Sequence, residues 1–581
     1  MALNHNEISS LIWNVADDVL RGLFKPHEYG DIILPFVVLR RLDCTLEKDK
    51  DLAISLYNEY KTQVEDPSRI ILGKLKTTFF NHSNYDLNRL RQDPANVMIN
   101  FNNYLSGYSQ NVVEIVENFQ LEKPIEKLNK NNRLFEFIEK FSEIDLHPSI
   151  VSNFQMGQIF EELLRKFSEM SNETSGEHYT PRDVVNLLVA MVFSQDSDSL
   201  QGEGKVRSIY DPCCGTGGML TIGKEWVHKN VNDKIEFRLL GQELNPQTYS
   251  ICKSDMMITG EDPENIRQGS SLSADGFQGK KFDYMLTNPP YGVSWKSEKG
   301  FVKSESENPS GRFSAGTPRS SDGQLLFLQH LISKMESKGS RIGIVLNGSP
   351  MFTGDAGSGE SEIRKWIIEN DMLECVISLP NRLFFNTGIP TFIWIITNNK
   401  SQERQGKIQL INGSNFYRSM RKNLGDKAKQ ISPTDREKIL DIYASFKESE
   451  ESYIKDNHFF GYTKVTIEQP LEKDGKVVTS KQGKPKPDSS KRDYERIPLE
   501  DNIENYFEKE VKPHVPDSWM EQSKNSVGYE INFTKYFYKY KPLRSLHEIT
   551  QDLLRLESES CLLYTSPSPR DRTRSRMPSS A

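Results

Sequence analysis

The 581-residue chain lacks several features that define well-known classes of protein. It has only six cysteines and no Cys-x-x-Cys pair, so the sequence predicts neither a disulfide framework nor a metal site. No apolar run approaches the ~20 residues that cross a bilayer. The first residues, MALNHNEISS, lack the basic and apolar pattern of a secretory signal. We therefore expect a cytoplasmic protein with no membrane contact.

The chain also has fewer positively than negatively charged residues, with 74 Lys and Arg against 81 Asp and Glu and a net charge of −7. A protein that binds DNA unaided through its phosphates is usually basic. Any role with nucleic acid therefore requires a local basic surface or a partner. The pattern G-x-x-x-x-G-K-[ST] occurs nowhere, which excludes a P-loop motor in this chain.

What the chain does contain is 36% hydrophobic and 10% aromatic residues, enough for two to four domains with real cores. Residues 1–170 are predicted to form a helical domain, because apolar residues recur there at helical spacing. No pattern in this part suggests chemistry, so we expect it to contact other molecules. The helical stretches are 9–20, 111–119, 134–144 and 156–170.

Residues 171–400 are predicted to form the catalytic domain. Short apolar strands alternate there with helical stretches and turns, which indicates an α/β fold with a parallel sheet covered by helices on both faces. The expected strands are 208–210, 238–240, 284–287, 342–346, 375–379 and 391–396.

Residues 401–560 are expected to form a mostly helical C-terminal region for contact with a partner or DNA. The stretch 400–430 carries a net charge of +6, which indicates either such a contact surface or a merely solvated face. Residues 473–492, rich in Lys, Ser, Pro and Gly, are predicted to be a flexible loop. The last 21 residues, 561–581, hold four Arg and no Lys, and we interpret them as a non-native tail rather than a natural basic one.

A glycine-rich turn, Asp211-Pro-Cys-Cys-Gly-Thr-Gly-Gly218, follows the first expected strand. Glycine lets backbone N–H groups approach a ligand closely, and the start of a helix favours negative charge. A plain tight turn is the alternative. The turn residues expected at a ligand are Gly215, Thr216, Gly217 and Gly218.

The next strand ends at Glu243, where a doubly wound fold places the carboxylate that accepts hydrogen bonds from ribose hydroxyls. A solvated strand-end carboxylate would have the same sequence. The glycines are spaced as G-T-G-G rather than as the G-x-G-x-x-G of dinucleotide enzymes. Asp211 is placed to hydrogen-bond an amino group, such as that of a methionine-like moiety. The pattern therefore favours S-adenosylmethionine over a nicotinamide cofactor.

The most informative motif is Asn288-Pro289-Pro290-Tyr291, at the end of an apolar strand. Two successive prolines fix the backbone and make a rigid bend. The bend can aim the Asn288 side-chain oxygen and the Pro289 carbonyl at one exocyclic amino group, holding both its hydrogens. Tyr291 then offers a flat face on which an extruded base can stack.

With these motifs, the chain resembles the modification (M) subunits of type I restriction-modification systems, which are N6-adenine DNA methyltransferases. The resemblance covers about residues 1–560, and its motifs occur in the order of the family. They are Gly176-Glu-His-Tyr-Thr-Pro-Arg182, the glycine-rich turn, Glu243-Leu-Asn-Pro246, Asn288-Pro-Pro-Tyr291 and the segments 321–332, 345–352 and 385–388.

The resemblance implies a Rossmann-like core that uses S-adenosylmethionine, with Asn288, Pro289, Pro290 and Tyr291 as the catalytic motif. In one departure, Ser270 stands where many relatives have an Asp that contacts the adenine ring of the cofactor. Besides the glycine-rich turn, the cofactor-binding residues that the resemblance implies are Glu177, His178, Tyr179, Thr180, Pro181, Arg182 and Glu243.

The implied reaction is methyl transfer to N6 of adenine in double-stranded DNA. Sequence recognition would come from a separate specificity (S) subunit flanked by two M subunits, and a restriction (R) subunit would complete the complex. Two other classes remain as alternatives. One is an RNA or protein-glutamine methyltransferase, which also uses Asn-Pro-Pro-Tyr, and the other is a catalytically impaired DNA-binding scaffold subunit.

Overall fold

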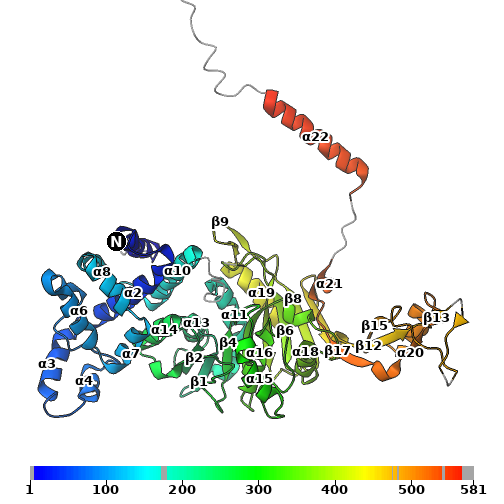
Figure 1. The fold of residues 1–581 in the computed structure, drawn as a ribbon, viewed down its shortest axis with the longest axis horizontal. Helices are drawn as coiled ribbons and strands as arrows, with labels where there is room; N and C mark the ends of the chain where they lie inside the picture. Colours follow the sequence, from blue (N-terminus) through cyan, green and yellow to red (C-terminus); the bar gives the residue numbers. More distant parts are fainter. Residues whose placement is uncertain are drawn as a thin grey trace, which may run out of the picture. The chain divides into compact units, whose positions relative to one another are not determined.

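The computed structural model describes residues 5–171, 180–385, 387–473, 476–480, 483–538 and 544–565 (Figure 1). The chain divides into two compact units, Met1–Phe533 and Thr534–Ala581. None of the described helices is both long enough and apolar enough to span a membrane.

Helices build the first part of the chain, as predicted. The central helix α2 is buried on nearly every side, which explains its apolar sequence. Within α2, the Arg41 guanidinium donates to the Val151 carbonyl and to Asn153 Oδ1, at 2.8 and 2.7 Å, and so ties α2 to the start of α10. The helices are α1 (His5–Val15), α2 (Gly30–Leu46), α3 (Lys50–Tyr60), α4 (Ser68–Leu75), α5 (Leu87–Leu90), α6 (Val97–Ser106), α7 (Gln110–Asn118), α8 (Glu122–Lys130), α9 (Leu134–Ser142) and α10 (Asn153–Ser171).

A nine-stranded sheet of order β11-β8-β6-β7-β5-β4-β1-β2-β3 forms the centre of the molecule. Its neighbouring strands are parallel except that β7 is antiparallel to β5 and β6, and β11 to β8. The predicted parallel sheet is therefore correct apart from these two strands, and each of the six expected strands is present. The strands are β1 (Val206–Asp211), β2 (Glu236–Glu243), β3 (Ile266–Gln268), β4 (Tyr284–Thr287), β5 (Arg341–Asn347), β6 (Leu373–Ser378), β7 (Thr391–Thr397), β8 (Lys407–Asn412) and β11 (Ser452–Asp456).

Helices cover both faces of this sheet. Ile209 of β1 packs in one core with α11, α13, α14 and α19, whereas the Tyr210 hydroxyl lies 3.0 Å from Nε2 of His330 on α16. Since successive strand residues point to opposite faces, α16 lies on the other side. The remaining helices of this part are α11 (Arg182–Ser194), α12 (Ser197–Leu200), α13 (Gly218–Asn230), α14 (Pro246–Thr259), α15 (Lys299–Ser306), α16 (Gln324–Ser333), α17 (Ser349–Phe352), α18 (Gly359–Glu369) and α19 (Pro433–Ser445).

The sheet continues beyond residue 400, where the sequence placed the end of the catalytic domain. Strand β8 pairs with β6 because Ile408, Leu410 and Ile411 are fully buried there. The domain limits themselves stay a prediction.

The sequence predicts a mostly helical C-terminal region. The structure differs, because a second sheet forms there around β12. The sequence of β12, Gly-Tyr-Thr-Lys-Val-Thr-Ile-Glu, is rich in the β-branched residues that favour strands. Within 473–492, predicted to be a flexible loop, β14 pairs with β13 in a short hairpin. The elements are β9 (Arg418–Leu424), β10 (Lys427–Gln430), β12 (Gly461–Glu468), β13 (Glu472–Lys473), β14 (Lys476–Val477), β15 (Asp493–Pro498), α20 (Ile503–Tyr506), β16 (Trp519–Met520), β17 (Ser526–Tyr529) and α21 (Phe533–Phe537).

The second unit holds one long helix, α22 (Leu546–Thr565). The helix begins in the region 401–560, predicted to be mostly helical, and continues into the residues interpreted as a non-native tail. Leu546, Leu553 and Leu554 are more than half exposed.

Candidate functional site

The glycine-rich turn joins β1 to α13 at the carboxyl edge of the sheet. Gly215 and Gly217 have φ angles of +54° and +86°, which glycine adopts without strain. A Cβ atom at Gly217 would lie 2.8 Å from Cys252 Sγ of α14, so a larger residue there would displace α14. The Cys214 N–H donates to the Gln242 carbonyl at 3.0 Å, which holds the turn against the end of β2.

Asp211 ends β1 and is only 2% exposed. Its Oδ1 accepts hydrogen bonds from the Cys213 N–H at 2.9 Å and from the Thr287 hydroxyl at 2.7 Å. Burial nevertheless disfavours the charged form and raises the pKa of Asp211 to about 7. Near neutral pH this carboxyl group is therefore divided between its neutral and charged forms.

Glu243 ends β2 and lies beside the same turn. Its two carboxylate oxygens accept from the Gly215 N–H at 2.9 Å and from the Asn245 N–H at 2.8 Å. A carboxylate has about four lone-pair sites, so each oxygen can still accept a hydrogen bond from a ligand. The predicted contact with ribose hydroxyls therefore fits the geometry.

The predicted catalytic motif follows β4, on the other side of β1. The Asn288 Nδ2 group donates to the Thr180 hydroxyl at 2.9 Å, which brings together two motifs that lie 108 positions apart in sequence. Pro289 is buried and Pro290 is half-buried. Thr180 therefore fixes the rotation of the Asn288 amide.

The ring of Tyr291 was expected to offer a face for stacking on a base, but the contacts of Tyr291 in the structure are different. Its hydroxyl donates to Asn288 Oδ1, and its ring packs edge-on against Phe384, with 6.2 Å between the ring centroids. Burial raises the pKa of Tyr291, which keeps the hydroxyl protonated and able to donate. In this conformation the Tyr291 hydroxyl is hydrogen-bonded to Asn288 Oδ1, the oxygen that was expected to accept a hydrogen bond from an amine.

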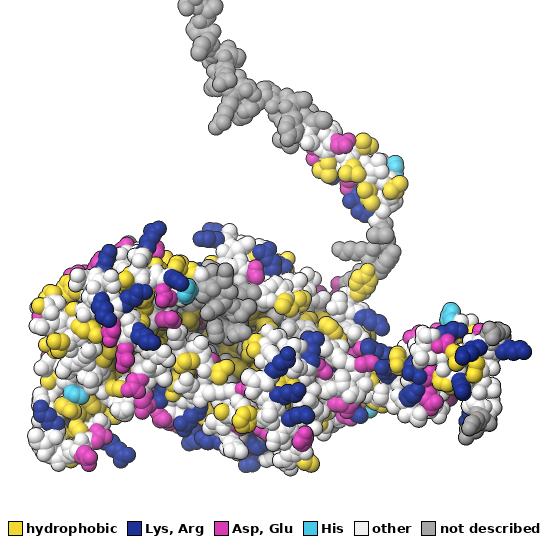
Figure 2. Space-filling view, in the orientation of Figure 1, with side chains coloured by type: hydrophobic (Ala, Val, Ile, Leu, Met, Phe, Trp, Pro, Cys, Tyr) yellow, Lys and Arg dark blue, Asp and Glu magenta, His cyan; other side chains and the backbone are white. Residues whose placement is uncertain are grey.

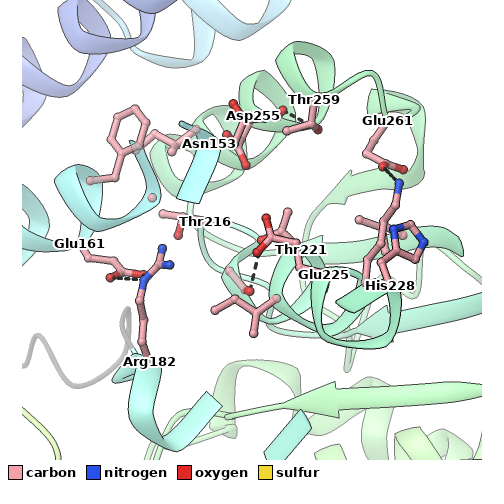
Figure 3. Close-up of a pocket in the computed structure, with 17 residues that line it drawn as sticks. Asn153, Glu161, Arg182, Thr216, Thr221, Glu225, His228, Asp255, Thr259 and Glu261 are labelled. Carbon is pink, nitrogen blue, oxygen red and sulfur yellow. Dashed lines mark hydrogen bonds and ion pairs between the residues drawn. The ribbon is translucent and has the colours of Figure 1, made fainter. Parts of the chain in front are cut away.

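Asp211, Asn288 and Thr180 line a cavity of about 50 Å³ together with the glycine-rich turn, whereas Glu243 and Tyr291 do not line it. It adjoins a second cavity of about 170 Å³ between α10, α13 and α14, and the two share the residues Glu161, Thr216, Gly218 and Ile222 (Figure 3). The first cavity is lined by Glu161, Thr180, Val185, Asp211, Cys213, Cys214, Gly215, Thr216, Gly218, Met219, Ile222 and Asn288.

Of the predicted segment 177–182, Glu177, His178 and Tyr179 lie outside the described residues. Pro181 is buried and precedes the first residue of α11. Arg182 does not line the first cavity. Its Nε donates to both carboxylate oxygens of Glu161 in α10 at 2.9 Å, as Figure 3 shows. A Cβ atom at Gly157, one turn earlier in α10, would lie 2.4 Å from the Arg182 guanidinium.

The second cavity is strongly acidic apart from Arg182 and Lys224. Burial raises the pKa of Asp255 to about 6, although Arg41 and Arg182 oppose the shift. Burial also raises the pKa of Glu225, again against Arg182. Arg182 is therefore an electrostatic link between the helical domain and the α/β core, and its cofactor contact stays a prediction.

Ser270, the departure from the family pattern, is hydrogen-bonded to a carboxylate from another segment. Its hydroxyl donates to Glu298, which also accepts from the Ser273 hydroxyl at 3.0 Å. The carboxylate of Glu298 therefore lies beside Ser270, although residue 270 itself is not acidic.

The sequence did not point to Glu161, Thr287 or Glu298. Each acts through a partner that is distant in the chain, so no local spacing marks it. Glu161 lies within a predicted helical stretch and has no sequence signature of its own.

Known protein families match most of this chain. Residues 152–477 match the N-6 DNA Methylase family, and residues 8–141 match the HsdM N-terminal domain. The type I restriction enzyme MjaIX methylase subunit of Methanocaldococcus jannaschii is 28% identical over 490 residues, covering 81% of this chain and 83% of that protein. The MpnII methylase subunit of Mycoplasma pneumoniae is 24% identical over 490 residues, covering 76% of this chain and 84% of that protein.

Among solved structures, the methyltransferase subunit of a type I restriction-modification system from Streptococcus thermophilus has the same fold. It superposes with a TM-score of 0.61 at 22% identity, over 78% of this chain and 96% of that one. The first family covers more than half of the present chain, and the second covers the helical domain that precedes it. The chain therefore belongs to the N-6 DNA methylase family, as the methylase (M) subunit of a type I restriction-modification system.

Proposed function

We propose that this M subunit methylates N6 of adenine in double-stranded DNA. Its cofactor, S-adenosylmethionine, supplies an electrophilic methyl group. The observation that carries the adenine assignment is the placement of Asn288, which Thr180 orients beside the cavity bounded by Asp211 and the glycine-rich turn. An amide oxygen and a proline carbonyl at a rigid strand end form an acceptor pair suited to an exocyclic amine.

The adenine amine is a weak nucleophile because its lone pair is delocalised into the ring. Catalysis must therefore come from positioning, and from acceptors whose hydrogen bonds strengthen as positive charge develops on nitrogen. Asn288 Oδ1 and the Pro289 carbonyl fill this role, and each accepts one hydrogen of the amine. Tyr291 must first release Asn288 Oδ1, which frees its ring to stack on the extruded base.

The described residues also fit the cofactor. Asp211 offers an acceptor for an ammonium group, and Glu243 offers acceptors for ribose hydroxyls. Pockets for ligands of this size measure ~300–1,000 Å³, so we infer that the two adjoining cavities open into one when the cofactor binds. The roles of Glu177, His178 and Tyr179 stay predictions.

The proposed partners are inferred from the net charge of the chain and from the lack of a base-reading segment in its sequence. With a net charge of −7 and no inserted segment for reading bases, this chain would bind duplex DNA weakly by itself. We propose that a specificity subunit flanked by two copies of this chain supplies recognition, and that a restriction subunit carries the nuclease and motor functions.

The test is to purify the chain with the specificity subunit of its own system and to incubate the complex with unmethylated DNA. Mass spectrometry of the digested nucleosides should find N6-methyladenine. N4-methylcytosine as the product would overturn the adenine assignment, and methylation of RNA or glutamine instead of DNA would favour the alternative classes. Site-specific methylation by the purified chain alone would refute the need for a partner.

A further inference from the structure

Apart from Lys407, which is exposed at the start of β8, the Lys and Arg residues of the basic stretch 400–430 form two sets. Lys400, Arg404 and Lys427 are buried, at 7%, 1% and 5% exposure. Lys400 pairs with Asp371 at 2.6 Å, and Lys427 pairs with both oxygens of Asp183 at 3.0 Å. These buried cations hold the fold together and are not accessible to a ligand.

The second set lies on the β9–β10 hairpin. Arg418, Arg421 and Lys422 on β9 are exposed, and Lys429 on β10 lies over the Tyr417 ring at 3.6 Å. Among the residues that the structure describes, no carboxylate forms an ion pair with any of these four. Figure 2 shows Lys and Arg side chains gathered over β9. The hairpin is thus a positively charged arm on a chain that is acidic overall.

This arm buries little surface of its own. Five of the seven residues of β9 are exposed, and an isolated two-stranded hairpin is marginally stable in water. Its turn and its second strand, in contrast, are anchored to the core. The Asp426 N–H in the turn donates to the Phe385 carbonyl at 2.7 Å, the Ala428 N–H of β10 to the Arg382 carbonyl at 3.0 Å, and the Ile431 N–H to Asp183 at 2.9 Å. The core therefore holds β10 and the turn and leaves β9 exposed.

The anchoring elements are those that carry the catalytic site. Asp183 lies three residues after Thr180, whose hydroxyl accepts from Asn288. Phe384, in the segment that receives the hairpin backbone, packs against Tyr291. The turn and β10 are thus joined to both sides of the position that the target base would occupy.

Resting on the proposed function, we propose that the β9–β10 hairpin contacts the phosphate backbone of duplex DNA next to the target adenine. Arg and Lys side chains supply most phosphate contacts in protein–DNA complexes, and such contacts set the position of the protein on the duplex. Protein interfaces are instead depleted in Lys and have an apolar centre. The exposed side chains of β9 are basic and polar, which favours a phosphate backbone over a protein surface.

The test compares two double variants of the full chain. Arg421→Ala/Lys422→Ala removes two charges from the arm, and Lys473→Ala/Lys476→Ala removes two from the exposed β13–β14 hairpin, which lies far from β9 in Figure 1. Fluorescence anisotropy with a fluorescein-labelled 30-base-pair duplex, titrated from 20 to 200 mM NaCl, gives the slope of log K against log salt. Each lost phosphate contact reduces the slope by about 0.9. The arm variant should therefore lose about 1.8 in slope, and the control variant nothing.

S-adenosylmethionine affinity, measured for each variant, should be unchanged and reports a folded site. An arm variant with wild-type slope and affinity would overturn the proposal. So would unchanged DNA binding combined with lost binding of the specificity subunit, because the arm would then be a protein contact. Nucleoside mass spectrometry on the wild-type complex tests the proposed methylation separately from the proposed DNA contact of the hairpin. Absence of N6-methyladenine, with arm-dependent DNA binding intact, would refute the proposed reaction alone.

Discussion

Asp211 is expected to make cofactor binding depend on pH. Burial raises its pKa to about 7, yet only its charged form pairs with the ammonium group of S-adenosylmethionine. At pH 6 about one Asp211 in eleven is ionised, and at pH 7 about half, so the affinity should rise about fivefold between these values. Asp211→Asn keeps Oδ1 as an acceptor for the Cys213 N–H and the Thr287 hydroxyl but cannot ionise. Its affinity should be weaker at pH 7 and independent of pH.

Isothermal titration calorimetry with S-adenosylhomocysteine, which carries the same ammonium group, measures this dependence. Stability should change in the opposite direction. The folded protein keeps the Asp211 proton up to about pH 7, whereas the unfolded chain releases it near pH ~3.9. The wild type therefore loses stability relative to Asp211→Asn as pH rises through this window, by about 4 kcal/mol over the whole window and by about 2.6 kcal/mol between pH 5 and pH 8. Urea unfolding at pH 5 and pH 8 measures the difference. Wild-type binding that is flat from pH 6 to 7 would refute the assignment of Asp211 to the ammonium group.

Three further substitutions test the site. Glu243→Gln should weaken S-adenosylmethionine and S-adenosylhomocysteine alike, by about 10- to 150-fold, since a charge-assisted hydrogen bond contributes roughly 1.5–3 kcal/mol. Glu236→Gln, at the exposed start of the same strand, is the calorimetric control, and equal affinities for both variants would leave Glu243 without a cofactor role. Asn288→Ala should abolish transfer of a tritiated methyl group while cofactor affinity stays within a few-fold; retained turnover would remove Asn288 from catalysis. Thr180→Val should lower kcat more than Thr180→Ser, which keeps the hydroxyl that orients Asn288, and equal rates would contradict this positioning role.

The sequence predicts the catalytic core well because its signals are local. Residues 284–287 form a short apolar run that two prolines follow, and β4 has the same limits. The glycine-rich turn and Glu243 meet because parallel strands end at one edge of the sheet. For the same reason, the positions of Asp211 and Asn288 follow from their places at strand ends.

Features that depend on distant pairing could not be predicted in this way. Strand β12 pairs with β15 and β17, which follow it by about 30 and 60 residues, so no local pattern announces their sheet. The burial of Lys400 and Lys427 depends on Asp371 and Asp183, which other elements supply. The orientation of Tyr291 toward Asn288 depends on the packing of Phe384, which lies in another loop.

The close approach of Gly157 to Arg182 has a consequence for how such sequences diverge. A side chain at residue 157 would push the guanidinium away from Glu161, which now holds it with two hydrogen bonds. A new residue at 157 is therefore tolerated only together with a shorter one at 182. We expect the two positions to co-vary among relatives, so that glycine at the first accompanies arginine at the second. A single point mutation in the helical domain would then reach the wall of the second cavity, which Arg182 lines, without changing a residue of the sheet.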